Sequence, residues 1–554
     1  MRQLSSFLFS LFTLVSLKGA LASLDAFPKI NLEYAVHAAT YTNSSPSGLE
    51  VATYANIRYA QPPIGNLRFR NAKTPPPHHD GILNGREYPV TDCVSSVPAM
   101  VPFPPLNGTH WGQEDCLFLN VLVPEGVKEG DKVPVLHWLH GGAFTFGSKD
   151  NKGAFPAGEK DMTYTSPPYM GLFNQINSHD EKFILVASNY RLGVYGWVSS
   201  PFEKDLDSNI GLHDSRTSLE WTKKYISRFG GDPDRITAMG ESAGATLVTL
   251  LLTGDGGAGE LPFSQAIISS PTLMPRRNVT ARRQSLYDYV LHQANCSSPA
   301  CLRNLSPASL ANVNNHIISD VPTESGGGSF GPGIGLSPVV DGAYIPDTAT
   351  ILFSQGRFHK SVRGVMVANM ENEGMGIGSD ANMPAAFPNL ARKVFTTADN
   401  KTLGHIQSLF PYPPSTPQKL GWDWLTSVAY ACLAKGTAEA YGERAFRYVM
   451  TIPPATHGQD LSYLFYGTEK SPAVANATIA RTLEHYVLNF LHHGGRDHGA
   501  LPGRPGLPDW KSYGKGANTM NISEATFEMV PDPWQVNGVC AELLKVVEDP
   551  KNGA

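Results

Sequence analysis

A serine flanked by glycines joins an apolar run to a helical pattern, and this junction restricts the possible folds more than any other feature of the chain. The motif Gly240–Gly244 reads G-x-S-x-G with Ser242 at its centre, directly after the apolar run Ile236–Met239 and before the helix-forming run Ala245–Leu252. A serine in this context lies on a sharp strand-to-helix turn that leaves almost no room for side chains two residues to either side, and glycine fits both places. The junction predicts an α/β fold with Ser242 as a nucleophile, and a tight turn without chemistry is the alternative.

The same motif occurs a second time, around Ser329 in Gly327–Gly331. That copy lies in a glycine-rich stretch, 325–335, which is typical of a loop rather than of a strand-to-helix junction. The context therefore favours Ser242.

Other apolar runs predict further buried strands with helices between them. The helical pattern Ser215–Phe229 places several apolar side chains on one face just before the run at 236–239, as a βαβ unit requires. The sequence thus predicts a mostly parallel, twisted sheet with helices on both faces. We expect one domain over 23–554, because the candidate catalytic residues extend from Gly141 to His457 and must meet at one site. The runs expected to form strands are Val133–Leu139, Phe183–Ser188, Ile236–Met239, Ala266–Ser269 and Val362–Ala368.

Composition and charge exclude some classes of protein. With 41% hydrophobic and 17% charged residues among 554, the chain can bury a large core and lacks a fibrous or disordered signature. A formal net charge of -5 without a basic stripe argues against nucleic acid as a partner. The segment Met1–Ala22 has Arg2, an apolar run and a small-x-small end, which predicts a signal peptide cut after Ala22 and a secreted, soluble protein. No later segment offers about 18 uninterrupted apolar residues, so we expect no stable membrane anchor.

Six cysteines allow three disulfide bonds in the oxidising compartment to which a signal peptide leads. Many pairings are possible, and we expect the sequential one because it closes three loops that do not interlace. The expected pairs are Cys93 with Cys116, Cys296 with Cys301, and Cys432 with Cys540.

The acceptor pattern for N-glycosylation recurs along the chain, which predicts a glycoprotein in which not every site is occupied. A match at Asn304 is poorer because Pro307 follows it. The expected sites are Asn43, Asn107, Asn278, Asn295, Asn400, Asn476 and Asn521.

A glycine-containing loop, His140–Phe144, follows the expected strand Val133–Leu139. Such a loop can aim backbone N–H groups at the negative oxygen of a tetrahedral intermediate, and each donor lowers the barrier by about 3 kcal/mol. We assign this oxyanion hole to Gly142, Ala143 and Ala243, the last being the residue after the nucleophile. An ordinary turn after a strand is the alternative interpretation of the loop.

These residues, in this order, resemble the type-B carboxylesterase and lipase family, which includes cholinesterases and secreted fungal lipases. The resemblance covers nearly the whole mature chain and is weakest over 278–337 and beyond Gly467. It implies an α/β-hydrolase fold and hydrolysis of carboxylic esters. The landmarks that carry it are Ala60–Pro63, Leu67–Phe69, Glu114–Asn120, Asn189–Gly193 and Phe229–Gly244.

The resemblance also implies the other two members of a catalytic triad. The acid of the family precedes a glycine after a strand, which matches Glu373 and leaves Glu371 as a solvated neighbour. The histidine of the family precedes an apolar strand ending in glycine, which matches His457 before Leu461–Gly467. The resulting order of nucleophile, acid and base is the one expected of the fold.

These assignments predict an acyl-enzyme mechanism. A neutral imidazole would accept the proton of Ser242, Glu373 would hold the tautomer of His457, and water would release the acyl group. We expect no cofactor and no metal ion. The one group of histidines that suggests a metal site consists of His492, His493 and His498, but no Cys or acidic ligands at the spacing of a zinc site accompany them.

The substrate is expected to be a small-molecule ester. Phe144 and Phe146 are close enough to the oxyanion loop in the sequence to contact this substrate. Choline specificity is not indicated, because Trp111, the only Trp of the Cys93–Cys116 loop, is too near Cys116 to align with the choline-binding aromatic residue of the family. The same loop holds four prolines, which oppose the amphipathic helix of an interfacial lid and favour an esterase over a lipase. An acyltransferase or lactone-processing enzyme remains an alternative, and a non-catalytic binding protein is disfavoured because Ser242 is present.

Overall fold

The computed structural model describes most of the chain. The described residues are 27–45, 47–77, 81–98, 108–150, 169–272, 276–320, 335–375, 383–467, 474–494 and 499–554. The expected signal peptide, the second glycine-flanked serine at Ser329, and the sequon at Asn107 lie outside them.

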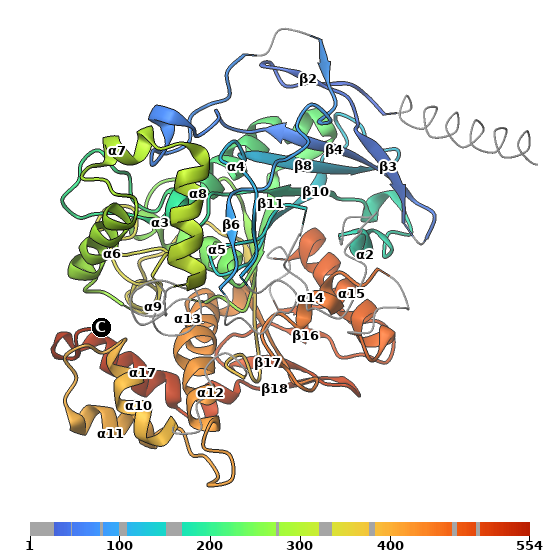
Figure 1. The fold of residues 1–554 in the computed structure, drawn as a ribbon. Coiled ribbons are helices and arrows are strands. Elements are labelled where there is room, and N and C mark those ends of the chain that lie inside the picture. The colour runs from blue at the N-terminus through green and yellow to red at the C-terminus, as the bar shows by residue number, and fades with distance from the viewer. Residues whose placement is uncertain are drawn as a thin grey trace, which may run out of the picture.

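A single large sheet runs through the centre of the described structure (Figure 1), with the strand order β18-β17-β14-β13-β12-β11-β9-β10-β8-β4-β3. The strands from β10 through β9 to β17 pair in parallel, while β8, β4 and β3 at one edge and β18 at the other pair antiparallel. The mostly parallel sheet predicted from the sequence is confirmed. The strands are β3 (Tyr41–Ser44), β4 (Glu50–Arg58), β8 (Phe118–Pro124), β9 (Val133–Leu139), β10 (Ile184–Ser188), β11 (Gly231–Glu241), β12 (Gln265–Ser269), β13 (Gly364–Met370), β14 (Ala445–Met450), β17 (Asn518–Ile522) and β18 (Phe527–Pro531).

Helices cover both faces of the sheet because the central strands are apolar on both sides. Along β10, Ile184 and Val186 pack into the core under one set of helices, and Leu185 and Ala187 pack into the core under the other. The first face is covered by α3 (Gly193–Trp197), α4 (Ile210–Tyr225), α5 (Ala243–Thr253), α6 (Thr280–Gln293), α8 (Pro307–Asn315), α9 (Ala349–Ser354) and α13 (Cys432–Tyr441). The second face is covered by α2 (Met170–Phe173), α14 (Asp460–Leu464) and α15 (Ala477–His493).

A third group of helices packs around its own apolar cluster, at the lower left of Figure 1. It consists of α10 (Met383–Arg392), α11 (Asn400–Ser408), α12 (Lys419–Leu425) and α17 (Val539–Glu548). The remaining short elements are α7 (Pro299–Asn304), α16 (Pro533–Val536), β1 (Ile30–Asn31), β2 (Val36–His37), β5 (Ile82–Leu83), β6 (Ser95–Ser96), β7 (His110–Trp111), β15 (Ala500–Leu501) and β16 (Trp510–Lys511). Within the described ranges, every helix is too short or too polar to cross a membrane.

One predicted strand is wrong. The run Leu461–Gly467 was expected to be a strand, but its first four residues belong to helix α14. Leu461 and Leu464 face the core beside α15, and a short apolar run cannot be assigned to strand or helix from periodicity alone. The five other predicted strands correspond to β9, β10, β11, β12 and β13.

Three disulfide bonds join the cysteines in the expected sequential pairs, Cys93–Cys116, Cys296–Cys301 and Cys432–Cys540. The last bond connects α13 to α17, and so ties the third helix group to the helices that cover the sheet. Of the sequon asparagines in the described ranges, Asn278, Asn295 and Asn400 are exposed, while Asn43, Asn476 and Asn521 are partly buried.

Candidate active site

The turn that carries Ser242 is strained and tightly enclosed. Ser242 has φ 55° and ψ -119° between the end of β11 and the start of α5, and its N–H donates to the carbonyl of Ser269 at 2.9 Å. A Cβ on Gly240 would lie 2.3 Å from the carbonyl carbon of Gly244, and one on Gly244 would lie 2.0 Å from the carbonyl oxygen of Leu139. Both glycines are therefore required by close backbone approach, which is the reason that the motif has glycine on each side.

Three side chains from different parts of the chain form a hydrogen-bonded row. His457 lies with its Nε2 2.8 Å from Ser242 Oγ and its Nδ1 2.6 Å from Glu373 Oε2. Glu373 is fully buried in the turn after β13, and His457 lies in the loop between β14 and α14. Glu371 is exposed, as expected for a solvated neighbour. The structure thus brings together the serine, histidine and glutamate that the sequence analysis selected.

The second oxygen of Glu373 has its own donors, which the sequence analysis missed. Ser270 Oγ donates to Glu373 Oε1 at 2.6 Å, and the N–H of Met370 donates to the same oxygen at 2.7 Å. Ser270 directly follows β12, which is the neighbour of β13 in the sheet. A polar residue at the carboxyl end of a neighbouring parallel strand is the signal that could have identified it.

Two further carboxyl groups surround the histidine. Glu241, the residue before the nucleophile, is buried with Oε1 3.4 Å from His457 Nε2, and burial raises its pKa to about 8. Burial alone would lower the pKa of His457, but the carboxylates of Glu373 and Glu241 outweigh it and raise that pKa to about 9. Asp460 is also buried, with a pKa raised to about 6 by burial, and accepts a hydrogen bond from Tyr448 at 2.7 Å. The site therefore favours the imidazolium that forms when the serine is deprotonated.

The glycine-containing loop after β9 lies beside the nucleophile because β9 and β11 are adjacent strands. Gly142 and Ala143 have φ of 110° and 53°, and a Cβ on Gly142 would lie 2.0 Å from the carbonyl oxygen of Phe146. A Cβ on Gly141 would lie 3.2 Å from Ser242 Cβ, which shows how closely the loop approaches the serine. Ala243 begins α5, and N–H groups in the first turn of a helix have no acceptor within it.

The two phenylalanines expected to contact substrate are both buried. Phe144 packs edge-on against Trp197, with ring centroids 5.2 Å apart, and also lines a cavity of about 50 Å³. Phe146 packs with Val97, and Trp111 packs against the same small cluster. Both phenylalanines are thus part of the core, and Phe144 also borders this cavity.

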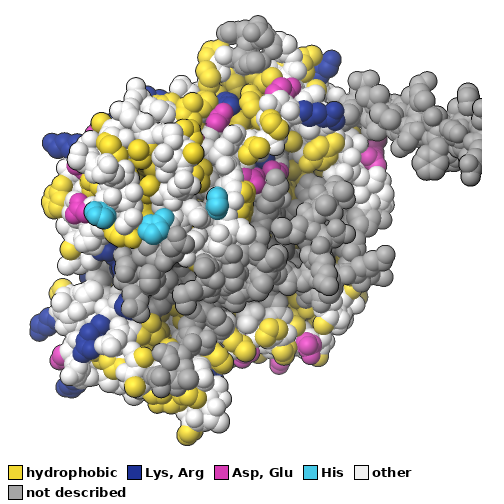
Figure 2. Space-filling model, viewed as in Figure 1, with side chains coloured by type: hydrophobic (Ala, Val, Ile, Leu, Met, Phe, Trp, Pro, Cys, Tyr) yellow, Lys and Arg dark blue, Asp and Glu magenta, His cyan; other side chains and the backbone are white. Residues whose placement is uncertain are grey.

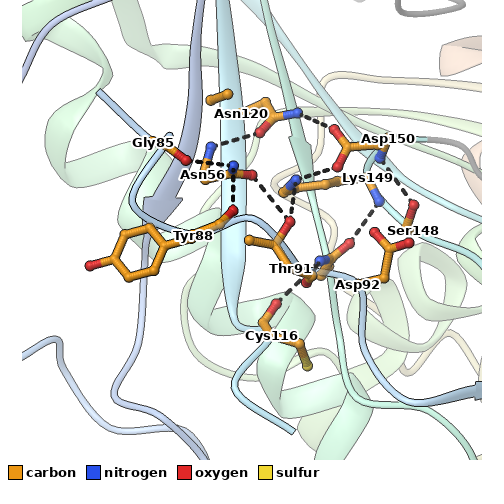
Figure 3. Close-up of polar contacts among 12 residues, drawn as sticks. Asn56, Gly85, Tyr88, Thr91, Asp92, Cys116, Asn120, Ser148, Lys149 and Asp150 are labelled. Atoms are coloured by element: carbon orange, nitrogen blue, oxygen red, sulfur yellow. Dashed lines mark hydrogen bonds and ion pairs between the residues drawn. The ribbon is translucent and has the colours of Figure 1, made fainter. Parts of the chain in front are cut away.

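A buried polar network anchors the segment that follows the oxyanion loop (Figure 3). Lys149 is fully buried, with Nζ 2.6 Å from Asp150 Oδ2 and 3.1 Å from Thr91 Oγ1. Asn120 on β8 donates to Asp150 Oδ1 at 2.7 Å, and Asn189 accepts the N–H of Lys149 at 2.7 Å. The network joins the sheet, the base of the Cys93–Cys116 loop and the segment after the oxyanion loop, so it fixes these three parts relative to one another.

Two of the three clustered histidines, His492 and His493, lie at the end of α15. His492 Nε2 lies 3.0 Å from the carbonyl oxygen of Glu181, and His498 falls outside the described residues. Over the part of the chain that can be described, three or more His, Cys, Asp or Glu side chains do not gather in a way that could hold a metal ion.

Similarity to known proteins extends over most of the chain. A family model described as the carboxylesterase family matches residues 30–407. Carboxylesterase patB of Aspergillus clavatus is 30% identical over 538 residues, which cover 88% of this chain and 92% of that protein. The secreted triacylglycerol lipase LIP1 of Gibberella zeae is 28% identical over 550 residues, or 86% of each chain. The crystal structure of Aspergillus niger EstA matches with a TM-score of 0.76 over 96% of this chain and 100% of that one, at 24% identity.

Proposed function

Because the chain belongs to the carboxylesterase family and has its α/β-hydrolase fold, it is a carboxylic ester hydrolase, and we propose that it acts through an acyl-enzyme on Ser242. His457 is the general base and Glu373 the triad acid. The observation that carries the proposal is the hydrogen-bonded row from Ser242 Oγ through both ring nitrogens of His457 to a buried carboxylate.

The proposed reaction has two halves. In the first, Ser242 Oγ attacks the ester carbonyl while His457 Nε2 takes its proton, and the N–H groups of Gly142, Ala143 and Ala243 stabilise the oxyanion. The C–O bond to the alcohol then breaks, and the imidazolium gives its proton to the departing alcohol. In the second half, water loses a proton to His457 and attacks the acyl-enzyme, which releases the acid and restores Ser242.

We also propose a preference for dissolved esters over oil droplets. The reason is the proline content of the Cys93–Cys116 loop, of which residues 99–107 lie outside the described structure. A relative is named a triacylglycerol lipase, so lipase activity is the principal alternative. Transfer of the acyl group to an alcohol other than water is a second alternative with the same acyl-enzyme.

We propose that residues 23–554 form a single catalytic domain. We also propose that the protein is secreted after cleavage of a signal peptide. The three disulfide bonds and a relative named as secreted support this location. Glycans are proposed first at the exposed Asn278, Asn295 and Asn400. No nucleic acid partner is proposed. On the face shown in Figure 2 the Lys and Arg side chains are scattered, with several at the lower left, and they form no continuous stripe.

A panel of nitrophenyl esters, assayed with and without an added alcohol acceptor, tests the reaction. The wild-type protein should release nitrophenol, and Ser242→Ala should abolish release while leaving the melting temperature unchanged. An organophosphate should label Ser242 alone. Near wild-type activity in Ser242→Ala, or a label at Ser329, would overturn the assignment, and an ester product formed from the added alcohol would favour acyl transfer.

The choice between esterase and lipase has its own test. The rate on a short-chain ester should rise smoothly as its concentration passes the solubility limit, because no helix is expected to swing open at an oil surface. A rate on emulsified long-chain triglyceride that exceeds the rate on soluble esters would establish the lipase alternative.

A further inference from the structure

The helices α12 and α13 belong to one continuous helical run (Figure 1), and a π-helical turn, η7 (Thr426–Ala431), lies between them. Every residue of η7 is buried, and the turn packs against β13, the strand that leads to Glu373. Turns of this kind are rare and are frequently found at functional sites. The contacts of η7 with the catalytic triad are therefore of interest.

The first of these contacts is with the turn that holds the triad acid. The N–H of Gly374, the residue after Glu373, donates to Thr426 Oγ1 at 3.0 Å. A Cβ on Gly374 would lie 2.3 Å from the carbonyl oxygen of Trp422, so the turn fits closely against α12 as well. The helical run is thus attached to the backbone directly beside Glu373.

The second contact is between Tyr430 of η7 and the imidazole of His457. The two ring centroids are 4.9 Å apart, and the ring planes are inclined by 52°. Tyr430 is buried, and only 11% of the His457 side chain is exposed. The tyrosine hydroxyl interacts with the side chain of Thr272, whose N–H donates to Thr246 Oγ1 on α5 at 2.9 Å. Tyr430 thus connects the histidine with the helix that follows the nucleophile.

The ring of Tyr430 contacts a group that becomes a cation in each half of the proposed reaction. An aromatic ring attracts a cation within about 6 Å of its centroid, and the attraction is strongest where water is excluded. Burial and the charges of Glu373 and Glu241 raise the pKa of the Tyr430 hydroxyl, so this group is neutral at physiological pH and does not exchange protons with His457. The ring, and not the hydroxyl, is therefore the part of Tyr430 that acts on the imidazolium.

The ionisable groups around His457 come from three other elements. They are Glu373 after β13, Glu241 at the end of β11, and Asp460 on α14, and the charge of each one raises the pKa of His457. Of these, Glu373 fixes the imidazole at Nδ1 only. A ring packed against the imidazole itself opposes the rotation that would move Nε2 away from Ser242, and small displacements of a catalytic group are costly for the rate.

We propose that Tyr430 is a positioning residue for the ester hydrolysis, whose ring holds the imidazole of His457 between Ser242 and Glu373 and stabilises the imidazolium. The inference rests on the proposed function, because it requires His457 to act as the general base. Tyr430 acts through His457 and not through a contact with the substrate.

Two variants separate the ring of Tyr430 from its hydroxyl. The assay measures kcat and KM for 4-nitrophenyl butyrate as a function of pH, and labelling with an organophosphate counts the folded active sites. Tyr430→Leu removes the ring and should lower kcat by about tenfold, leave KM within about threefold, and move the acidic limb to lower pH by about half a unit or more. Tyr430→Phe keeps the ring and should retain kcat within about threefold, with the acidic limb in place.

The matched control is Tyr441→Leu, which removes a buried tyrosine of the same helical run. Tyr441 lies on α13 and donates its hydroxyl to the carbonyl of His359 at 2.9 Å, away from the triad. This variant should keep kcat within about twofold per labelled site and leave the acidic limb in place, because its ring does not act on the imidazolium.

The outcomes separate this inference from the proposed function. Equal losses in Tyr430→Phe and Tyr430→Leu would assign the effect to the hydroxyl, and an equal loss in Tyr441→Leu would assign it to general packing; either result overturns the inference. A wild-type kcat in Tyr430→Leu, an acidic limb that does not move, or a change confined to KM would overturn it as well. All of these results leave the proposed function standing while hydrolysis depends on Ser242. Hydrolysis that survives Ser242→Ala would overturn the proposed function itself.

Discussion

Ser270→Ala tests whether the triad acid depends on its second hydrogen-bonded oxygen. In the structure, Glu373 is fully buried, with Oε2 toward His457 and Oε1 toward Ser270 Oγ at 2.6 Å and the N–H of Met370 at 2.7 Å. The substitution removes one donor to Oε1 and leaves the other. Because the carboxylate is out of contact with solvent, water cannot replace the lost donor without rearrangement.

The expected loss follows from this geometry. A hydrogen bond to a charged group contributes about 1.5 to 3 kcal/mol, and the remaining bond from Met370 still holds the carboxylate in place, so the lower end applies. At about 1.4 kcal/mol for each factor of ten, kcat/KM should fall by about tenfold. This is far less than the loss expected when the acid itself is replaced.

Hydrolysis of 4-nitrophenyl butyrate measures kcat/KM, and thermal melting followed by circular dichroism measures stability. Ser269→Ala is the matched control, since Ser269 is the adjacent buried serine and its hydroxyl lies 3.3 Å from Tyr448 instead of contacting Glu373. The control should keep more than about half of the activity if both proteins have similar melting temperatures. Equal losses in the two variants, or no loss in Ser270→Ala, would refute the reasoning.

Three other predictions concern the triad, a disulfide and the buried lysine. Glu373→Gln should lower kcat/KM by about four orders of magnitude. It should also move the acidic limb of the pH–rate profile to lower pH, because it removes the carboxylate that raises the pKa of His457. An acidic limb that stays in place or moves to higher pH would contradict this prediction. Replacing both Cys432 and Cys540 by serine opens the long loop that their disulfide bond closes. The free energy of unfolding, measured by urea titration, should fall by about 4 to 5 kcal/mol. A loss below about 1 kcal/mol would mean that helix packing alone holds this region together. Lys149→Met breaks the buried ion pair and should cost about 1.5 to 3 kcal/mol in the same titration, and an unchanged midpoint would show that the network is not needed for stability.

The amino-acid sequence by itself determined the architecture around the nucleophile. The run Val133–Leu139 is apolar except for His137 and became β9 with the same bounds, because a strand covered on both faces has no solvent-facing side on which polar residues would alternate. Gly240 reports local backbone crowding, because a Cβ there would meet Gly244 four residues later, and a single sequence contains a signal of this kind. Gly244 instead reports the close approach of Leu139 on the neighbouring strand β9, which only the packing of the sheet brings about.

Only the tertiary structure decided which distant groups meet. Glu373 and Glu371 are two residues apart in similar sequence, yet one is buried against His457 and the other is exposed. The assignment of Leu461–Gly467 as a strand failed for a related reason, since the packing of α15 selects a helix there. The donors to Glu373 likewise arise where β12 and β13 come together, because contacts between segments far apart in the chain depend on how those segments pack.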